Sequence, residues 1–324
     1  MLSNEERFSL INVANIRSGL LKDNFVTSPK VFAEYADQSR GVPILIQANK
    51  NLFHFEKKDV FELSSKQILK TIYLLSDDAY VGFKHAFTHF KFLTNFEVKK
   101  AHKLSVDRMV KQNLDNINHV SFLKDKFKQV GAFQTRNIPH FGHEKIIKRM
   151  LDFCDHVVVN PVIGPKKRGD VTVECLTKIY TYLSETKYKD KISLKPIFAN
   201  MFYAGPREAM HHTLLRQRIG FQHFAIGRDH AGAEHAYKPN MAVSLMKQYE
   251  KKLTIGLLLH AGACFCSACK KVILVGDCDH HSKNMMDISG TTFRANIMMK
   301  RNFSLADEKM QRYLFKSKMD IFEL

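Results

Sequence analysis

Long hydrophobic runs are missing from this sequence, and their absence excludes a membrane-spanning helix. The longest apolar stretches, such as LTIGLLLHAGA (residues 253–263), are too short to cross a bilayer. The first twenty residues carry early acidic side chains and no continuous apolar segment, so no secretory signal is visible. A chain of 324 residues with 45% hydrophobic residues is long enough for a large domain and a smaller one, or for two comparable domains. We therefore expect a globular protein of the cytoplasm with no membrane partner.

Acidic residues are also scarce relative to basic ones. Fifty Lys and Arg face 32 Asp and Glu, and the resulting formal charge of +18 favours anionic partners such as nucleotides, sulfate or phosphate. Much of the lysine is scattered along predicted helices, as in EVKKAHKLSVDRMVKQ (97–112), so a solvated basic surface explains the charge as well as a nucleic-acid-binding face does. The interleaved glycine and aromatic residues of an RNA-binding signature are absent, so we predict no nucleic-acid partner.

The order of the predicted elements changes near residue 130. Upstream no repeating unit is visible: residues 41–48 are predicted as a strand, 65–75 as a helix or a strand, and 86–98 as an alternating strand. Downstream, strands and helices alternate, which is typical of right-handed crossovers onto a parallel sheet. The predicted strands are 129–133, 156–163, 192–202 and 223–227, and the predicted helices are 143–154, 173–185 and 206–220. Ligands of such sheets bind at the carboxyl ends of the strands.

The loop QTRNIPHFGH (134–143) stands between the first of these strands and the following helix. A helix amino terminus offers unpaired N–H groups and a partial positive charge, which suit a phosphate. Arg136, His140 and His143 add donors, and Gly142 lets a ligand approach the backbone closely. One histidine could instead cap the helix while the others are solvated, but so dense a cluster at a strand-loop-helix junction favours a polyanion site.

Two later segments offer similar chemistry. GRDHAG (227–232) follows a predicted strand, its small residues expose the backbone, and Arg228 and His230 offer donors to anionic oxygens. A tight turn with a surface ion pair is the alternative for this segment. SGTTFR (289–294) can begin a helix with Ser289 or Thr291 as its cap and with Arg294 one turn in, facing a polyphosphate.

The cysteines suggest a metal site rather than disulfides. Cys266, Cys269 and Cys278, followed by His280 or His281, have the spacing of a tetrahedral zinc site. Disulfides explain the pattern less well because the chain is expected to be cytosolic. Four protein ligands leave no open position, so such a zinc ion would be structural. The other cysteines, Cys154, Cys175 and Cys264, are expected to behave as small buried hydrophobes.

The motif His140-Phe141-Gly142-His143 after a strand resembles the HxGH nucleotidylyltransferase superfamily. The surrounding letters resemble one branch more closely, the ATP sulfurylases, whose loop reads Gln-Thr/Val-Arg-Asn-Pro-x-His-x-x-His. Here the proline comes one place later, at Pro139. Three further blocks resemble that family in the same order, and they are residues 160–171, 203–232 and 288–294. Some bacterial members also carry a Cys-x-x-Cys…Cys-x-His segment; that alignment favours His280, whereas direct geometry favours His281, and the choice stays open.

The resemblance implies a fold and an activity. The fold is α/β: a Rossmann-like parallel-sheet adenylyltransferase domain at 126–260, preceded at 1–125 by a shortened, diverged domain similar to a pseudouridine-synthase-and-archaeosine-transglycosylase (PUA) domain. A zinc knuckle and helical region at 261–324 would complete it. The activity is the sulfate adenylyltransferase reaction of sulfate assimilation, ATP plus sulfate giving adenosine 5′-phosphosulfate (APS) plus pyrophosphate, reversibly, with Mg²⁺ carried on the ATP. A homo-oligomer is a further expectation.

The same resemblance assigns residues to roles. Sulfate would contact Gln134, Arg136 and the backbone of Ala231. The catalytic residues would be Thr135, Arg136, Asn137, His140 and His143. The nucleotide would contact Gln134, Asn137, Gly142, His143, Gly227, Arg228, Asp229, His230 and Arg294. In contrast, His211, His212 and Arg216 are expected to be structural.

Two other functions compete with this one. The chain could transfer a nucleotidyl group to another anionic acceptor, or it could be a diverged, non-catalytic scaffold that binds nucleotide or RNA. The Gln-Thr-Arg-Asn loop favours a small tetrahedral oxyanion. A scaffold without catalysis would not need the reactive residues of the loops at 134–143 and 227–232. No P-loop of the form Gly-x4-Gly-Lys-Ser/Thr occurs, which excludes a fused kinase of that type for adenylyl sulfate.

Overall fold

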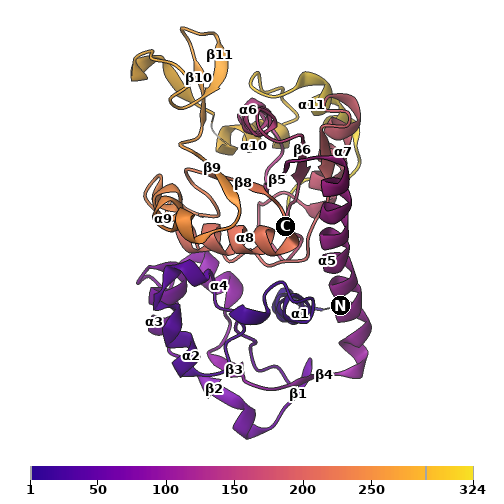
Figure 1. The fold of residues 1–324 in the computed structure, drawn as a ribbon, viewed down its shortest axis with the longest axis vertical. Helices are drawn as coiled ribbons and strands as arrows, with labels where there is room; N and C mark the ends of the chain where they lie inside the picture. Colours follow the sequence, from indigo (N-terminus) through magenta and orange to yellow (C-terminus); the bar gives the residue numbers. More distant parts are fainter. Residues whose placement is uncertain (1, 289, 324) are drawn as a thin grey trace.

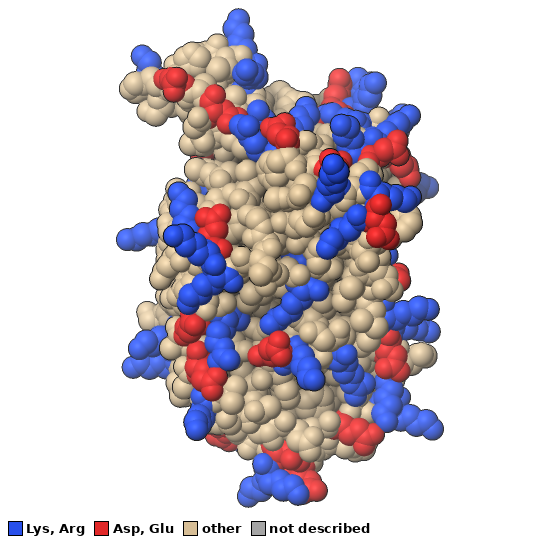
Figure 2. Space-filling view, viewed as in Figure 1, with Lys and Arg blue, Asp and Glu red and all other residues tan. Residues whose placement is uncertain are grey.

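The computed structural model describes residues 2–288 and 290–323. Figure 1 shows an elongated molecule with the N-terminal elements at one end, a parallel sheet in the middle, and a small lobe containing β10 (Ala263–Cys266) and β11 (Lys271–Leu274) projecting at the other end. Within the described ranges no helix has both the length and the apolar character that crossing a membrane requires. Lys and Arg are spread over the face seen in Figure 2, with Asp and Glu between them, so this face carries no single basic patch.

Five parallel strands form the central sheet, in the order β7-β6-β5-β8-β9. The strands are β5 (Val130–Phe133), β6 (His156–Val159), β7 (Ile192–Leu194), β8 (His223–Gly227) and β9 (Gly256–His260). The helices between them are α6 (Phe141–Leu151), α7 (Val173–Thr186), α8 (Pro206–Ile219) and α9 (Met241–Tyr249). The predicted alternation and parallel sheet are confirmed, although β6 and β7 are shorter than predicted and β9 was not anticipated. The chain runs outward from β5 in one direction and then returns to its other side, so β5 and β8 flank a topological switch point.

Both faces of this sheet are buried. On β5, Ala132 belongs to one hydrophobic cluster and Phe133 to another, and on β8 the neighbours Ile226 and Ala225 divide in the same way. This alternation follows from the strand geometry, which points successive side chains to opposite faces. Helices α8 and α9 pack into the first cluster, and α6 and α7 pack into the second. The sheet edge with the strands' carboxyl ends is therefore the part left open to a ligand.

Apart from α1 and the long α5, the N-terminal half is built from short elements. Its helices are α1 (Asn4–Arg17), α2 (Pro29–Ala33), α3 (Ser65–Ile68), α4 (Val81–Ala86) and α5 (Lys100–Lys126), and its strands are β1 (Phe53–His54), β2 (Val60–Glu62), β3 (Lys91–Leu93) and β4 (Glu97–Val98). The strand predicted at 41–48 is wrong, because these residues make only isolated bridges. Of residues 65–75, Ser65–Ile68 form a helical turn and Leu69–Tyr73 a π-helix. Residues 86–98 hold two short strands with different partners rather than one long strand.

Helix α5 joins the two halves and runs along the side of the molecule in Figure 1. It contacts α1, α8 and β5. Its buried Asn113 donates to Asn15 Oδ1 and to the carbonyl of Phe198, both at 3.0 Å, which ties the N-terminal helix to the loop after β7. One hydrophobic cluster contains residues from both sides of residue 125. The domain boundary at 125 stays a prediction, and the two halves share a core across it.

The projecting lobe is a three-stranded antiparallel sheet in the order β11-β10-β12, with β12 at Met285–Asp287. The chain continues into α10 (Gly290–Met298) and α11 (Glu308–Lys316), and α11 packs on α7. Asp277 ties the lobe to α6 through ion pairs with Lys145, at 3.3 Å, and with Arg149. The cap predicted at Ser289 or Thr291 lies outside the residues and side chains that the structure describes.

Candidate active site

The loops that follow β5, β8 and β9 meet at the carboxyl edge of the sheet. A cavity of about 270 Å³ lies there, and a second of about 320 Å³ adjoins it. The residues that line both cavities are Arg136, Asn137, Arg228, Asp229 and His230. The other residues predicted to bind sulfate or nucleotide are divided between the cavities: Gln134, Thr135, His140, Gly142, His143, Gly227 and Ala231 line the first, and Arg294 lines the second. The fold thus brings every one of these predicted residues to a single region at the switch point.

His140 and His143 are fixed by backbone hydrogen bonds at the start of α6. His140 is the N-cap, and its Nδ1 accepts from the N–H of Gly142 at 3.1 Å. His143 Nδ1 accepts from the N–H of His140 at 3.3 Å, and the two ring centroids are 4.0 Å apart. Because each Nδ1 is an acceptor, the neutral rings carry their proton on Nε2 and present an N–H donor. A Cβ at Gly142 would lie 2.8 Å from the His140 ring, so glycine is required for this close packing.

Burial keeps both histidines neutral. It lowers the pKa of His140 to about 4. It also lowers the pKa of His143 well below its ordinary value, with the nearby His140 and His260 rings adding to the effect. The cavity therefore holds paired neutral donors at a helix amino terminus, a combination that suits oxygens on which negative charge develops.

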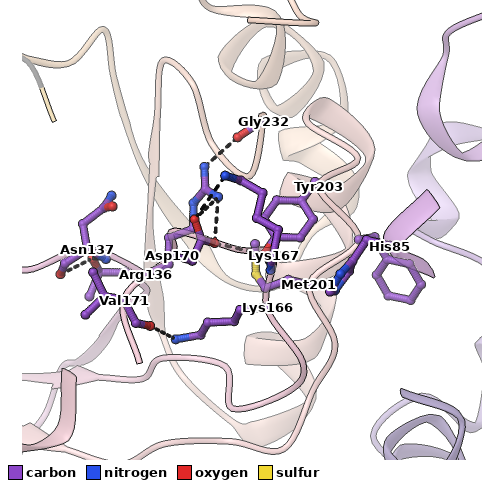
Figure 3. A network of polar contacts seen from close by, with 12 residues as sticks. His85, Arg136, Asn137, Lys166, Lys167, Asp170, Val171, Met201, Tyr203 and Gly232 are labelled. Atoms are coloured by element: carbon purple, nitrogen blue, oxygen red, sulfur yellow. Dashed lines mark hydrogen bonds and ion pairs between the residues drawn. The ribbon is translucent and has the colours of Figure 1, made fainter. Parts of the chain in front are cut away.

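Arg136 lies at the centre of a second network, drawn in Figure 3. Its Nη1 donates to Asp170 at 3.1 Å, its Nη2 donates to the carbonyl of Gly232 at 2.7 Å, and its guanidinium lies over the ring of Tyr203. Burial alone would lower the pKa of Arg136, but Asp170 and Tyr203 outweigh burial and raise it. Burial would raise the pKa of Asp170, but Arg136 and Lys167 hold it below its usual value. The result is a permanent cation that is oriented before any ligand binds.

Tyr203 connects this network to the N-terminal half. Its hydroxyl donates to Asp170 at 2.9 Å, and its carbonyl accepts from the hydroxyl of Tyr80. Its φ of 58° is unusual for a bulky side chain. The ring packs edge-on against His85 of α4, whose Nε2 lies 3.1 Å from the carbonyl of Pro165, as Figure 3 shows in part. Residues of the first 125 therefore support the loop that carries Asp170.

The remaining predicted residues are held less tightly. Arg228 pairs with Asp229 at 2.9 Å and with Asp287 of β12 at 3.4 Å, so the projecting lobe contributes one wall of the cavity. Arg294 of α10 donates to Asn137 Oδ1 at 3.4 Å. Arg228 thus links the GRDHAG segment to the projecting lobe, and Arg294 links the SGTTFR segment to the first loop.

Contacts of the loop 134–143 and the backbone turn at Ala231 shape the first cavity further. The Thr135 hydroxyl accepts from the N–H of Asn137 at 3.1 Å. Gln134 Oε1 is buried without a hydrogen-bond partner while its Nε2 lies 3.7 Å from Met201 Sδ. Ala231 has a φ of 55°, which turns the chain after β8 so that Ala231 lines the first cavity and the Gly232 carbonyl reaches Arg136. A buried amide oxygen without a partner, on a residue that lines the cavity, is consistent with a site that takes a polar ligand.

His260 is a cavity residue that sequence reasoning missed. It ends β9, lines the first cavity, and its Nδ1 accepts from the N–H of Gly262 at 3.2 Å. A Cβ at Gly227 would lie 2.8 Å from the His260 ring, so the glycine of GRDHAG makes room for it. Burial lowers the pKa of His260 to about 4. Its neutral ring and its Nδ1 acceptor repeat the pattern of His140 and His143. The sequence held a signal for it, a lone histidine that ends an apolar stretch two residues before a glycine.

The three predicted cysteine ligands converge in the projecting lobe with one of the two candidate histidines. Among the described residues, Cys266, Cys269, Cys278 and His280 place one ligand atom each within 4.8 Å of all the others. Around a tetrahedral zinc ion, sulfurs about 3.8 Å apart are expected from Zn–S bonds of about 2.3 Å. The sulfurs of Cys266 and Cys278 are 3.9 Å apart, which fits. His281 instead accepts from the N–H of Lys283 and caps a 3-10 turn, so the geometry favours His280.

A parallel sheet with an His-x-Gly-His helix start at its switch point defines a chain of the HxGH nucleotidylyltransferase class. Residues 117–310 match the family model described as ATP-sulfurylase, and the chain belongs to that family. It is 35% identical over 243 residues to the sulfate adenylyltransferase of Pyrococcus abyssi, covering 74% of this chain and 64% of that protein. It is 41% identical over 180 residues to the protein of the same name from Ignicoccus hospitalis, covering 55% and 47%.

Two further comparisons concern coverage and fold. The sulfate adenylyltransferase of Persephonella marina is 28% identical over 305 residues, which cover 91% of this chain and 78% of that protein. The chain spans less than two thirds of the length of the Pyrococcus and Ignicoccus proteins. A solved structure titled hexameric APS kinase from Thiobacillus denitrificans superposes with a TM-score of 0.62 at 10% identity, covering 96% of this chain and 62% of that one. At that identity the likeness concerns the fold alone.

Proposed function

We propose that this protein is a sulfate adenylyltransferase, which transfers AMP between pyrophosphate and sulfate. The observation that carries the proposal is the convergence of two groups on one pair of adjoining cavities: a pre-oriented guanidinium at Arg136 and a pair of neutral donors at His140 and His143. The first group suits a tetrahedral oxyanion and the second suits a polyphosphate. Membership of the ATP-sulfurylase family supports the assignment.

Arg136, Gln134 and the backbone of Ala231 hold sulfate in this proposal. The amide of Gln134, turned over so that its NH2 group faces the cavity, donates to a sulfate oxygen, because the two ends of an amide are interchangeable in shape. Sulfate carries no proton to be removed at neutral pH, so the reaction needs no general base. Positioning of the sulfate oxygen in line with the α-phosphorus, and stabilisation of the developing charge, account for the catalysis.

The nucleotide occupies the rest of the two cavities. His140 and His143 donate through Nε2 to oxygens of the departing pyrophosphate, beside the N–H groups that begin α6. Thr135 and Asn137 contact the α-phosphate, and Gly142 leaves the backbone accessible. Gly227, Arg228, Asp229, His230 and Arg294 border the nucleotide. Mg²⁺ accompanies the substrate phosphates and spreads their charge.

We also propose that the lobe binds a structural zinc ion and that residues 1–125 form a PUA-like domain. Three thiols and an imidazole form a donor set that suits zinc and leaves no open coordination position. The zinc ion would brace the lobe that supplies Asp287 to the cavity wall. We place the enzyme in the cytosol, where free thiols persist.

The experiment that tests the function is ATP formation from APS and pyrophosphate with Mg²⁺, using purified, zinc-loaded protein. Rapid ATP formation would establish sulfurylase chemistry. If folded protein forms no ATP, the proposal fails, and binding of ATP without turnover would then point to another acceptor or to a non-catalytic scaffold.

The zinc ligand is testable with a pair of adjacent histidines. We expect His280→Ala to weaken zinc binding by at least about 100-fold, because a ligand is lost, whereas loss of a supporting group costs only about 10- to 100-fold. The matched variant His281→Ala is expected to keep one zinc ion per chain. Metal content after dialysis against a weak chelator measures both variants, and loss of zinc from His281→Ala alone would contradict the assignment.

His260 is expected to act as a third neutral donor. Replacing it with leucine should lower kcat/KM for pyrophosphate by about tenfold, the effect of removing one neutral hydrogen bond. His260→Gln, which keeps an N–H near the Nε2 position, should retain most of the activity. Equal rates for wild type and His260→Leu would show that the ring has no contact with the reacting groups.

A further inference from the structure

Behind the cavities three titratable groups form a row, His230, His212 and Glu208, and the proposed mechanism gives the last two no role. His230, on the cavity wall, places its Nε2 3.0 Å from Nδ1 of His212. His212 Nε2 lies 3.3 Å from Oε1 of Glu208, one turn earlier on α8. His212 and Glu208 are fully buried. Glu208 is itself fixed, because its two carboxylate oxygens accept from the N–H groups of Phe202 and Ala204, each at 2.9 Å.

The surroundings of these three groups determine which of their atoms carry protons. Burial lowers the pKa of His212 and of His230 well below the ordinary value, and the nearby Arg216 adds to both shifts, so both rings are neutral. Burial raises the pKa of Glu208 to about 7, so at pH 8 this carboxyl is mainly ionised. A neutral imidazole has one N–H and one lone pair. His212 Nε2 makes no hydrogen bond to Glu208, but at 3.3 Å the carboxylate favours the tautomer with the proton on Nε2, because its negative charge would repel a lone pair there.

The tautomer of His212 in turn fixes the tautomer of His230 at the cavity. With its proton on Nε2, His212 has a lone pair on Nδ1, and only a donor can pair with it at 3.0 Å. His230 therefore carries its proton on Nε2 and donates inward. The other ring nitrogen, Nδ1, is then a hydrogen-bond acceptor on a residue that lines both cavities.

We propose that Glu208 and His212 are positioning residues that fix His230 as an acceptor for a hydroxyl or amino hydrogen of the nucleoside part of the substrate. This inference rests on the proposed function. It differs from the sequence-based expectation that His230 donates to anionic oxygens. An acceptor lone pair repels phosphate and sulfate oxygens, so His230 serves nucleoside recognition, while Arg136, His140 and His143 hold the anions.

The proton positions can be measured directly on the ligand-free protein. Histidine-selective ¹⁵N labelling with long-range ¹H–¹⁵N correlation at pH 8 distinguishes the two neutral tautomers, and the His230 signals are assigned by their loss in His230→Phe. We expect wild type to show His230 protonated on Nε2. His212→Asn places an amide oxygen near the former Nδ1 and should preserve that state, whereas His212→Leu should abolish it. His211→Gln, equally buried on the same helix but without a contact to His230, is the matched control and should change nothing.

Kinetics provide the second readout. His212→Leu is expected to raise KM for APS about tenfold, with kcat changed less than about threefold and KM for pyrophosphate unchanged, and His212→Asn should restore most of the loss. A wild-type His230 that is protonated on Nδ1 or doubly protonated would overturn the proposal, as would a defect confined to pyrophosphate. The tautomer measurement uses no substrate, so it can succeed even if no ATP is formed, which separates failure of this inference from failure of the proposed function.

Discussion

Replacing Arg136 with lysine is expected to lower ATP formation from APS and pyrophosphate by at least about 100-fold, within the range of about 10²–10³ for loss of one preorganised donor to a reacting oxyanion. The guanidinium already donates to Asp170 and to Gly232 and still has donors to spare for a ligand. An ammonium group has the same charge but lacks the planar fork that makes these contacts simultaneously. Steady-state rates at saturating pyrophosphate measure the effect.

Arg136→Ala adds a folding defect that must be separated from the catalytic one. It removes the guanidinium from beside Asp170, whose side chain is only 3% exposed. Loss of the sole partner of a buried charge costs about 3 kcal/mol, and since Lys167 remains 3.5 Å away we expect a cost of at most about that size. The double variant Arg136→Ala with Asp170→Asn also removes the carboxylate charge that has lost Arg136. We expect it to regain most of the stability in thermal denaturation but none of the activity. Recovery of activity in the double variant would refute a direct role for Arg136.

The same ion pair gives stability a predictable pH dependence. Arg136 and Lys167 hold the folded-state pKa of Asp170 below its usual value, so its contribution is fully present above the unfolded-state pKa, which is about 4. That contribution is lost as the pH falls through the lower folded-state value. Asp170→Asn should therefore weaken the acid dependence of the unfolding free energy, measured by denaturant titration between pH 5 and pH 3.

The parallel sheet was predictable because its signals are local. Each strand of the alternating region carries an apolar run, and each helix carries an apolar stripe, so sequence windows of ten to fifteen residues contain the information. The N-terminal half lacks such windows: its strands have only two or three residues, and the segment at 41–48 is extended because of single bridges to Phe25 and Phe92. Those pairings depend on distant parts of the chain, which periodicity does not reveal.

The residues of the candidate site also differ in how far the sequence predicts them. The loop residues from Gln134 to His143 could be named from the sequence because phosphate-binding chemistry concentrates them at one strand-helix junction. The residues that orient the site could not be named in this way, because they are distant in sequence. Asp170 is 34 residues from Arg136, and His212 is 18 residues from His230. A buried aspartate or histidine on a helix has many ordinary structural explanations, and only packing reveals which group it orients. The choice between His280 and His281 likewise depended on the local turn.

His140 has two roles, and one substitution separates them. Its Nδ1 caps α6, and its Nε2–H is the donor to pyrophosphate in the proposed function. Asparagine is among the best N-cap residues, so His140→Asn keeps an acceptor for the N–H of Gly142 while it removes the Nε2–H. We expect its thermal stability to match wild type and its kcat to fall by about 10²–10³-fold. His140→Ala loses the cap as well, and should be less stable by about 1 kcal/mol.

The protonation state of His140 gives this prediction a second test. Because burial lowers its pKa to about 4, the ring is neutral throughout pH 6–8, and it acts as a neutral donor rather than as a titrating acid. The pH profiles of kcat/KM for wild type and His140→Asn should therefore run parallel over this range, separated by a constant factor. A step near pH 6.5 in wild type that is absent from the variant would mean that the imidazolium form is the reactive one, and that the polyphosphate site works by charge pairing instead of preorganised neutral hydrogen bonds.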